Sequence, residues 1–342
     1  MKIHLIFLVL AFCMAAFAYS QTDADKDSDI YWTPSRPDGN APIGVMGDHT
    51  HHAGEWMVTY RYMFMDMDGN RDGTGRLNEQ DVLAEGFMVV PTRMTMGMHM
   101  FGAMVALNDR LTLMAMLPYL QISMDHVTRM GDRFTTESEG VGDLRLTGLY
   151  VLRRWNRQQL HFNAGIGFPT GSIEKRDDTP AGANRKLPYP MQLGSGTFDL
   201  FPGITYVGQT DSWSWGAQLE GTLRLGRNNA GYSLGNRVAA TVWGARKWTD
   251  WLSTSLRLNG QDWGNISGHD ADLNPAMAPT ADPGRRGGEQ MDLMFGVNLL
   301  GKAGFVEHHR LAMEVGAPIY QSLDGPQLER KWLLTAGWKY AW

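Results

Sequence analysis

Apolar and polar side chains alternate along most of this chain with a period of two residues. In Trp213–Leu225, the clearest example, Trp213 and Trp215 stand on one face and Gln218 and Glu220 on the other. Such alternation predicts β-strands with one apolar and one polar face. The pattern recurs in Glu55–Met67, Arg93–Leu107, Arg110–Met124, Val141–Leu152, Gln158–Phe168, Thr197–Gly208, Asn236–Lys247, Trp251–Gln261, Gln290–Leu300, His309–Tyr320 and Trp332–Trp342. We therefore expect about twelve strands, an even number as in bacterial outer-membrane barrels.

The connections between these segments are alternately short and long. The short ones lie near Asn108–Asp109, Arg153–Arg157, Gln209–Ser212, Trp248–Asp250 and Gly301–His308. The long ones lie near Asp66–Thr92, Asp125–Gly140, Pro169–Gly196, Gly226–Gly235, Asp262–Glu289 and Gln321–Lys331. Outer-membrane barrels have short periplasmic turns and long outer loops in this order. The sequence therefore predicts an all-β fold, an antiparallel up-and-down transmembrane β-barrel with both termini in the periplasm.

Composition agrees with a barrel that shows a lipid-facing residue only at every second position. The mean hydropathy is only −0.30, although the chain holds 12 tryptophans and 40 glycines. The last residues place Trp338, Tyr340 and Trp342 on one apolar stripe. Such a terminal stripe faces lipid and resembles the sorting signal that the barrel-assembly machinery reads. We expect outer-membrane lipid and that machinery as partners.

The first residues predict export. Lys2 precedes the apolar run Ile3–Phe17, and small residues follow it, as in a secretory signal peptide. We therefore expect a signal peptide at 1–20, a periplasmic segment at 21–54 and the barrel at 55–342, in the outer membrane of a Gram-negative bacterium. Cys13 is the one cysteine, so the mature chain has no thiol and no disulfide.

Charge and motifs exclude several classes of function. The formal net charge of −5 does not indicate a nucleic-acid-binding surface. The sequence shows no catalytic constellation and no phosphate-binding loop, so we expect neither an enzyme nor a bound cofactor.

The polar faces of the strands carry charges, and these would point into the lumen. They include Arg61, Asp143, Arg145, Glu220 and Arg224. Charges of both signs are compatible with pairs that hold the barrel closed and, equally, with an open polar pore.

Methionine is concentrated on the same inward faces of the first three strands. The candidates for a transport path are Met63, Met65, Met94, Met96, Met98, Met100, Met114 and Met116. Thioethers fill irregular apolar space, which favours packing or an apolar wall for hydrophobic solutes. Thioethers also bind soft ions such as Cu(I), which favours a path for a copper-like ion.

Two polar stretches are candidate ion sites. His49, His51 and His52 stand together just before the first strand, where imidazoles could bind a metal; the alternative is a solvated segment. In the first outer loop, a carboxylate or amide recurs at every second residue, as in calcium loops, although an ordinary turn fits the sequence better. These residues are Asp66, Asp68, Asn70 and Asp72.

Three segments resemble the outer-membrane proteins named for the meta-pathway of phenol degradation. They are "EGVGDLRLTGLYVL" at 139–152, "GFPTGS" at 167–172 and "LGSGTFDLFPGITY" at 193–206. The resemblance implies a barrel that passes small, often hydrophobic solutes across the outer membrane. The methionine-rich first third and the histidine cluster depart from this family's usual pattern and favour a metal-linked branch.

Three functions therefore remain open. The first is a channel or transporter for small solutes with a lumen partly lined by methionine. The second is a barrel that binds or passes a copper-like ion. The third is a closed structural or adhesion barrel.

Overall fold

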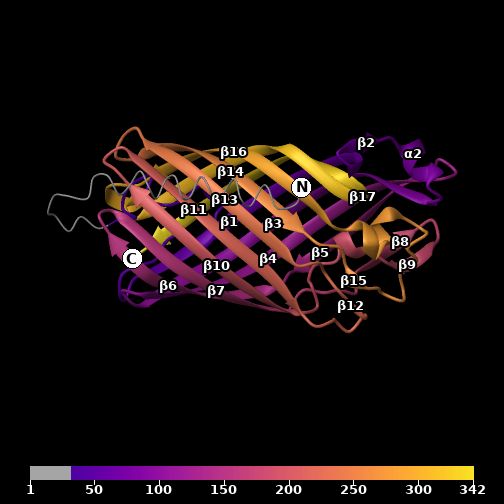
Figure 1. Ribbon diagram of the computed structural model, residues 1–342, viewed down its shortest axis with the longest axis horizontal. Helices are drawn as coiled ribbons and strands as arrows, with labels where there is room; N and C mark the ends of the chain where they lie inside the picture. Colours follow the sequence, from indigo (N-terminus) through magenta and orange to yellow (C-terminus); the bar gives the residue numbers. More distant parts are fainter. Residues whose placement is uncertain (1–31) are drawn as a thin grey trace.

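The computed structural model describes residues 32–342, so the predicted signal peptide and Cys13 lie outside the described residues. Eleven strands, each antiparallel to its neighbours, form a ring that closes where β1 pairs with β17 (Figure 1). The strands of the ring are β1 (Trp56–Gly73), β3 (Val89–Asn108), β4 (Leu111–Thr128), β6 (Leu144–Trp155), β7 (Gln158–Phe168), β10 (Phe198–Gln209), β11 (Trp213–Leu225), β13 (Arg237–Lys247), β14 (Leu252–Trp263), β16 (Gly288–Leu300) and β17 (His309–Ala341). The structure confirms the predicted all-β antiparallel barrel.

The longest strand, β17, doubles back on itself. Its first arm pairs with β16 and its last arm pairs with β1. The ring centroids of His309 and Tyr340, near the two ends of β17, are 4.6 Å apart, and Gln321 and Arg330 bond to each other near its middle. The two arms therefore occupy adjacent places in the wall. The ring has eleven strands when β17 is counted once, so the expected count of about twelve is approximately right.

The two ends of the barrel differ. Trp56 and Trp342 exchange backbone hydrogen bonds of 2.8 and 2.9 Å, so β1 begins where the chain ends; we call this the terminal end. The opposite loop end carries the small elements that project beyond the wall in Figure 1. They are β2 (Gly75–Leu77), α2 (Glu79–Ala84), β5 (Arg133–Val141), β8 (Arg176–Thr179), β9 (Gly182–Lys186), β12 (Tyr232–Ser233), β15 (Ser267–Gly268) and the 3₁₀ helices η1 (Tyr189–Met191), η2 (Pro279–Ala281) and η3 (Pro283–Arg285). A further 3₁₀ helix, η4 (Gly304–Val306), lies in the turn before β17.

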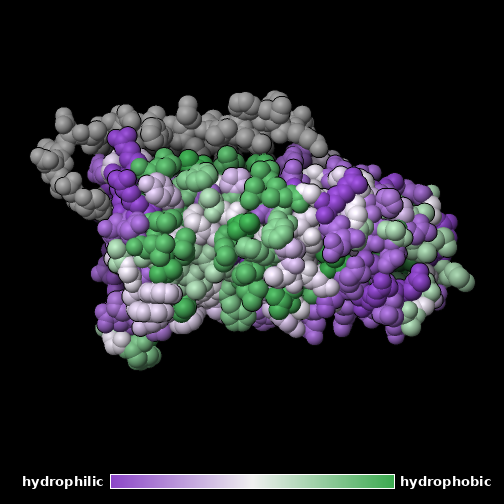
Figure 2. Space-filling model, turned by 90° about the horizontal axis from the view of Figure 1, so that it is seen from below, coloured by the Kyte–Doolittle hydropathy of each residue, from purple (hydrophilic) through white to green (hydrophobic). Residues whose placement is uncertain are grey.

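The outer face of the wall is apolar. Side chains that alternate along the strands, such as Phe101, Leu113 and Phe295, are exposed there. Figure 2 shows apolar residues gathered over the middle of the barrel and hydrophilic residues at the loop end. This is the exterior expected of a barrel with lipid around its middle. Residues 32–342 contain no helix that is both long and apolar enough to cross a membrane.

One expected loop is a strand. The stretch that holds Asp66, Asp68, Asn70 and Asp72 was expected in the first outer loop, but it belongs to β1, which continues to Gly73. Its backbone remains paired with β17, as in the partners Asn70 and Leu328. That part of the expectation is wrong because backbone pairing continues beyond the point where the apolar alternation stops.

Candidate functional site: the plugged lumen

Most of residues 32–51, which precede the first strand, lie inside the barrel. Trp32, Ile43, His49 and His51 in this segment are each at most 8 % exposed. We call residues 32–54 the plug. The segment had been expected in the periplasm before the barrel, and its side chains contact inward-facing residues of strands around the ring, as the next paragraphs describe. The plug therefore lies in the lumen, with a cavity beside it at the terminal end.

Hydrogen bonds fix the plug to opposite sides of the wall. On β17, the guanidinium of Arg310 donates to the carbonyl oxygens of Pro37 and Pro34, at 2.6 and 2.9 Å. On β7, His161 bonds to the carbonyl oxygen of Gly47 at 2.9 Å. On β11, the amide of Gln218 donates to the carbonyl of Met46 at 2.8 Å. Because the wall satisfies these buried backbone carbonyls, a polar segment can be buried without a large cost.

A buried ion pair of the wall contacts the plug at Gly44. Arg257 on β14 and Glu314 on β17 form two hydrogen bonds of 2.7 and 2.8 Å. The backbone N–H of Gly44 also donates to Glu314, at 3.1 Å. A Cβ at Gly44 would lie 2.4 Å from the side-chain atoms of both Arg257 and Glu314. A larger residue at this position would therefore have to displace the ends of these two side chains, so close approach, and not an unusual backbone conformation, favours glycine.

The three predicted metal-binding histidines are not brought together. His49 and His51 are buried with ring centroids 5.0 Å apart, and His49 contacts the carboxylate of Asp48 at 3.0 Å. His52 is exposed on the surface, where it lies 3.5 Å from Asp109. Across residues 32–342, no group of three or more His, Cys, Asp or Glu side chains is placed to hold a metal ion.

Burial makes His49 a weak base. It lowers the pKa of His49 from 6.5 to about 4, although the neighbouring Asp48 carboxylate acts in the opposite direction. Burial also lowers the pKa of His51, against the raising effect of Glu55. At neutral pH both imidazoles are uncharged in the docked plug.

The predicted inward charges mostly have partners. Arg145 and Glu220 form a two-bonded pair at 3.1 and 2.7 Å, and Arg224 pairs with Asp199. Asp143 instead accepts hydrogen bonds from backbone N–H groups in the loop after β7. Arg61 donates to the carbonyl of Val45 in the plug, at 3.3 Å. The sequence predicted that these side chains point inward, but not that Arg61 would bond to a segment of the chain inside the lumen.

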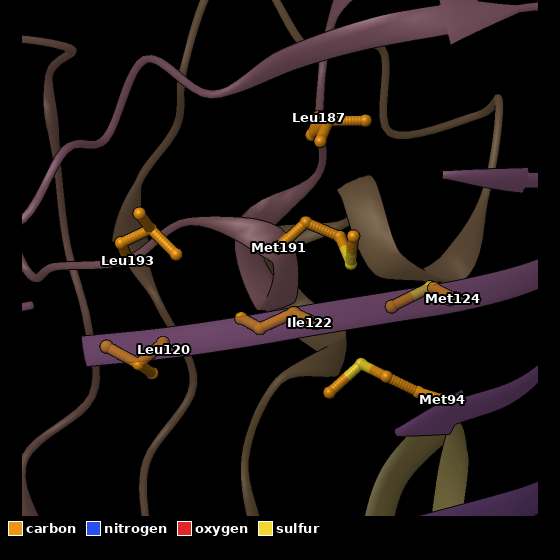
Figure 3. Close-up of a cluster of buried hydrophobic side chains, with 7 residues drawn as sticks. All are labelled: Met94, Leu120, Ile122, Met124, Leu187, Met191 and Leu193. Atoms are coloured by element: carbon orange, nitrogen blue, oxygen red, sulfur yellow. The ribbon is translucent and has the colours of Figure 1, made fainter. Parts of the chain in front are cut away.

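The methionines lie on the strand faces opposite the exposed aromatic residues and pack in two clusters. One cluster combines Met57, Met100, Met104, Met114, Met116 and Leu149, with Met46 of the plug and Met98 against it. The other, in Figure 3, combines Met94, Leu120, Ile122 and Met124 of the wall with Leu187, Met191 and Leu193 of the loop after β9; Met67, Met96 and Met98 pack against it. Met65 accepts a contact of 3.3 Å from Arg330, and Met63 lies on β1 with the same parity. In the second cluster a loop packs on the inward faces of β3 and β4, a contact that the sequence did not predict.

The four predicted calcium ligands are separated. Asp66 pairs with Arg93 at 2.9 Å, Asn70 donates to the carbonyl of Pro91, and Asp72 accepts from Gly325 in β17. Asp68 is exposed on β1. Only Asp66 and Asp72 use carboxylate oxygens in these contacts, and their partners lie on different strands, so the four side chains do not converge on one site.

Cavities remain on both sides of the plug. At the terminal end, a cavity of about 330 Å³ is lined by His49, His51, Arg310 and Lys339 among others. At the loop end, cavities of about 320 and 170 Å³ lie between the wall and the loops.

Comparison with known proteins supports the fold type. No protein-family model matches the chain, and no curated protein matches it in sequence. Its structure is similar to the crystal structure of an outer membrane channel from Pseudomonas putida F1, with a TM-score of 0.59 and 16 % identity over 86 % of this chain and 98 % of that chain. The transport unit of the autotransporter AIDA-I from Escherichia coli matches less well, with a TM-score of 0.46 and 10 % identity over 86 % of this chain and 93 % of that chain. At this level of identity, the likeness to the channel shows the fold: an antiparallel β-barrel of the outer-membrane type.

Proposed function

We propose that this protein is a non-enzymatic channel for small solutes in the outer membrane of a Gram-negative bacterium, and that the plug closes its lumen in the described state. The terminal end faces the periplasm and the loop end faces outward. The polar loops at one end and the short turns at the other support this orientation, since outer-membrane barrels keep long loops outside.

The way the plug is held carries this proposal. A barrel that served only as a closed structural element would be filled most stably by side chains of its own wall. Here the filling is a separate segment, docked through hydrogen bonds to side chains such as Arg310, His161 and Gln218. Neutral hydrogen bonds of this kind contribute roughly 0.5–1.5 kcal/mol each, and those from a charged group such as Arg310 about 1.5–3 kcal/mol, so they can be exchanged for water when the segment leaves.

The test is conductance of the purified barrel in planar bilayers. A variant that lacks residues 22–50 should conduct several-fold more than the wild type, because the lumen is emptied. A matched truncation of residues 22–31 leaves the plug intact and should behave as the wild type. Heat-modifiable mobility on gels establishes that each barrel is folded. A folded barrel without its plug that carries no current would instead support the closed structural or adhesion barrel.

A soft-metal path is a second candidate, supported by the number of thioethers in one cluster. Met57, Met100, Met104, Met114 and Met116 are all buried there. Thioethers favour Cu(I) and Ag(I), and they bind protons so weakly that affinity should not change with pH. A copper-like ion would then be cargo of the channel.

Titration with Ag(I) tests this candidate. Leucine keeps the volume and apolar character of methionine but is not a ligand, so replacing Met98, Met100 and Met104 by leucine should markedly weaken Ag(I) binding while the barrel stays folded. Unchanged Ag(I) binding in the leucine variant would mean that these methionines only pack.

A further inference from the structure

The two cavities at the loop end form one chamber of mixed character. Pro190, Trp263, Arg286 and Arg330 line both of them, so the cavities lie against each other. Their volumes of about 320 and 170 Å³ together lie at the lower end of the range of roughly 300–1,000 Å³ for small-molecule pockets. The lining of the chamber, and not its size alone, indicates what it would hold.

Positive charge dominates the larger cavity. Its lining includes Arg224, Arg237, Arg286 and Arg330, and no aspartate or glutamate of residues 32–342 lines either cavity. Arg224 pairs with Asp199, and Arg330 pairs with Asp292 at 3.1 Å. The charges of Arg224 and Arg330 are thus compensated by carboxylates that do not line the cavities.

The other two arginines have no such partner. Within the described part of the chain, neither guanidinium, of Arg237 or of Arg286, forms an ion pair or a hydrogen bond to a protein group. Burial lowers the pKa of Arg286 to about 10 while the charge of Asp282 acts in the opposite direction, so the side chain stays protonated at neutral pH. Arg286 is half-buried and Arg237 is exposed, so an anion that entered the larger cavity would meet two charged side chains that form no ion pair within residues 32–342.

Trp263 contacts the backbone of both arginines. It is the direct cross-strand partner of Arg237 in the pairing of β13 with β14. Its indole N–H donates to the carbonyl oxygen of Arg286 at 2.8 Å, and the backbone N–H of Arg286 donates to Asn265 at 2.7 Å. The backbone positions from which the two side chains extend are therefore linked through Trp263, which limits the ordering that a ligand must impose.

The smaller cavity is apolar on one side. Met67, Met94, Met124 and Leu328 line it, and these residues belong to or pack against the cluster in Figure 3. An anion whose charged head met the arginines would have an apolar body within reach of this wall. Arginine recognises a planar carboxylate through two parallel hydrogen bonds, and thioethers accommodate an apolar body of irregular shape.

We propose that the chamber is a binding site for a small amphiphilic carboxylate, with its head between Arg237 and Arg286 and its apolar body against the methionine wall. This proposal names a substrate class for the proposed channel. It rests on the proposed function only in that the channel would bring the ligand to the site. Binding is measured without conductance, so a barrel that never opened could still bind.

The experiment is calorimetric titration of the folded, full mature protein in detergent with benzoate. Acetate has the carboxylate but no large apolar group. Benzyl alcohol has a similar apolar ring but no charge, and inorganic phosphate is an anion with neither a carboxylate nor an apolar group. Benzoate should saturate the site with an affinity at least tenfold above that of acetate or phosphate, and benzyl alcohol should not bind measurably.

Variants assign the site. Arg237→Gln and Arg286→Gln each remove a charge without leaving a carboxylate unpaired, so the barrel should still fold, and each should weaken benzoate binding at least tenfold. The matched control, Arg185→Gln in the exposed strand β9, should bind as the wild type. The proposal is overturned if benzoate does not bind the wild type at millimolar concentration, if acetate or phosphate binds equally well, or if both chamber variants bind benzoate normally.

Discussion

Acidification should release the plug, because its docked state keeps a buried imidazole uncharged. The pKa of His49 falls from 6.5 to about 4 on burial, while a plug in water would titrate at the ordinary value. Between these two pH values the undocked plug binds a proton that the docked plug does not. Docking is therefore strongest above pH 6.5 and weakens as the pH falls toward 4.

The size of the effect follows from the same difference. The undocked imidazole has its ordinary pKa of 6.5, so pH 5 lies about 1.5 units below it. Protonation then favours the undocked plug by about 2 kcal/mol, or about 30-fold in the docking equilibrium. The charged neighbours of His49 are Asp48 in the plug and Lys339 on β17, and His51 lies beside it. Burial shifts the pKa of His51 in the same direction, so its contribution has the same sign.

Single-channel recording at pH 7.5 and pH 5 measures this. The open probability of the wild type should rise by up to about 30-fold at pH 5. His49→Gln keeps a hydrogen-bonding side chain but cannot be protonated, so most of the rise should disappear. His52→Gln, at the exposed histidine, should respond as the wild type. A His49→Gln barrel with the full wild-type response would refute the assignment, and a wild type without any response would refute the linkage itself.

Three further changes test other parts of the structure. Gly44→Ala places a Cβ 2.4 Å from both Arg257 and Glu314, so the plug should dock poorly and the conductance at neutral pH should rise; wild-type conductance would show that the pair can move aside. A cysteine at Ser172 should be labelled on intact cells and one at Asp211 only after permeabilisation, and the opposite pattern would invert the orientation. Deletion of Trp342, which removes the end of the stacked Trp338–Tyr340–Trp342 stripe, should prevent assembly into a heat-modifiable barrel; a normal yield of folded barrel would contradict its role in sorting.

The wall could be predicted from the sequence where lipid imposes a pattern. Trp213–Leu225 was expected as a strand and forms β11 with the same bounds, because alternation of apolar and polar residues continues along its whole length. Beyond the lipid the same backbone pairing continues with polar residues on both faces. Asp66–Asp72 therefore had the composition of a loop although it extends β1.

The contents of the lumen could not be predicted in this way. The plug has no apolar period, and its burial depends on polar partners such as Arg310 and Gln218 that come from distant strands. Leu187, Met191 and Leu193 are similarly isolated apolar residues in a loop, and only the folded barrel brings them to the methionines of β3 and β4. The positions of the methionines on the inward parity were expected, but a role in transport remains a prediction.

The plug is held by residues near the opposite end of the chain, and this links assembly of the barrel to closure of its lumen. Gly44 bonds to Glu314 across a separation of 270 residues, and Arg310 holds three carbonyl groups of the plug. Glu314 and Arg310 both lie on β17, the strand that also closes the ring by pairing with β1. The segment that is synthesised before the barrel therefore cannot reach its final position until the last strand is in place. A docked plug is then a mark of a completed barrel, and an unfinished one would keep this segment accessible to periplasmic proteases.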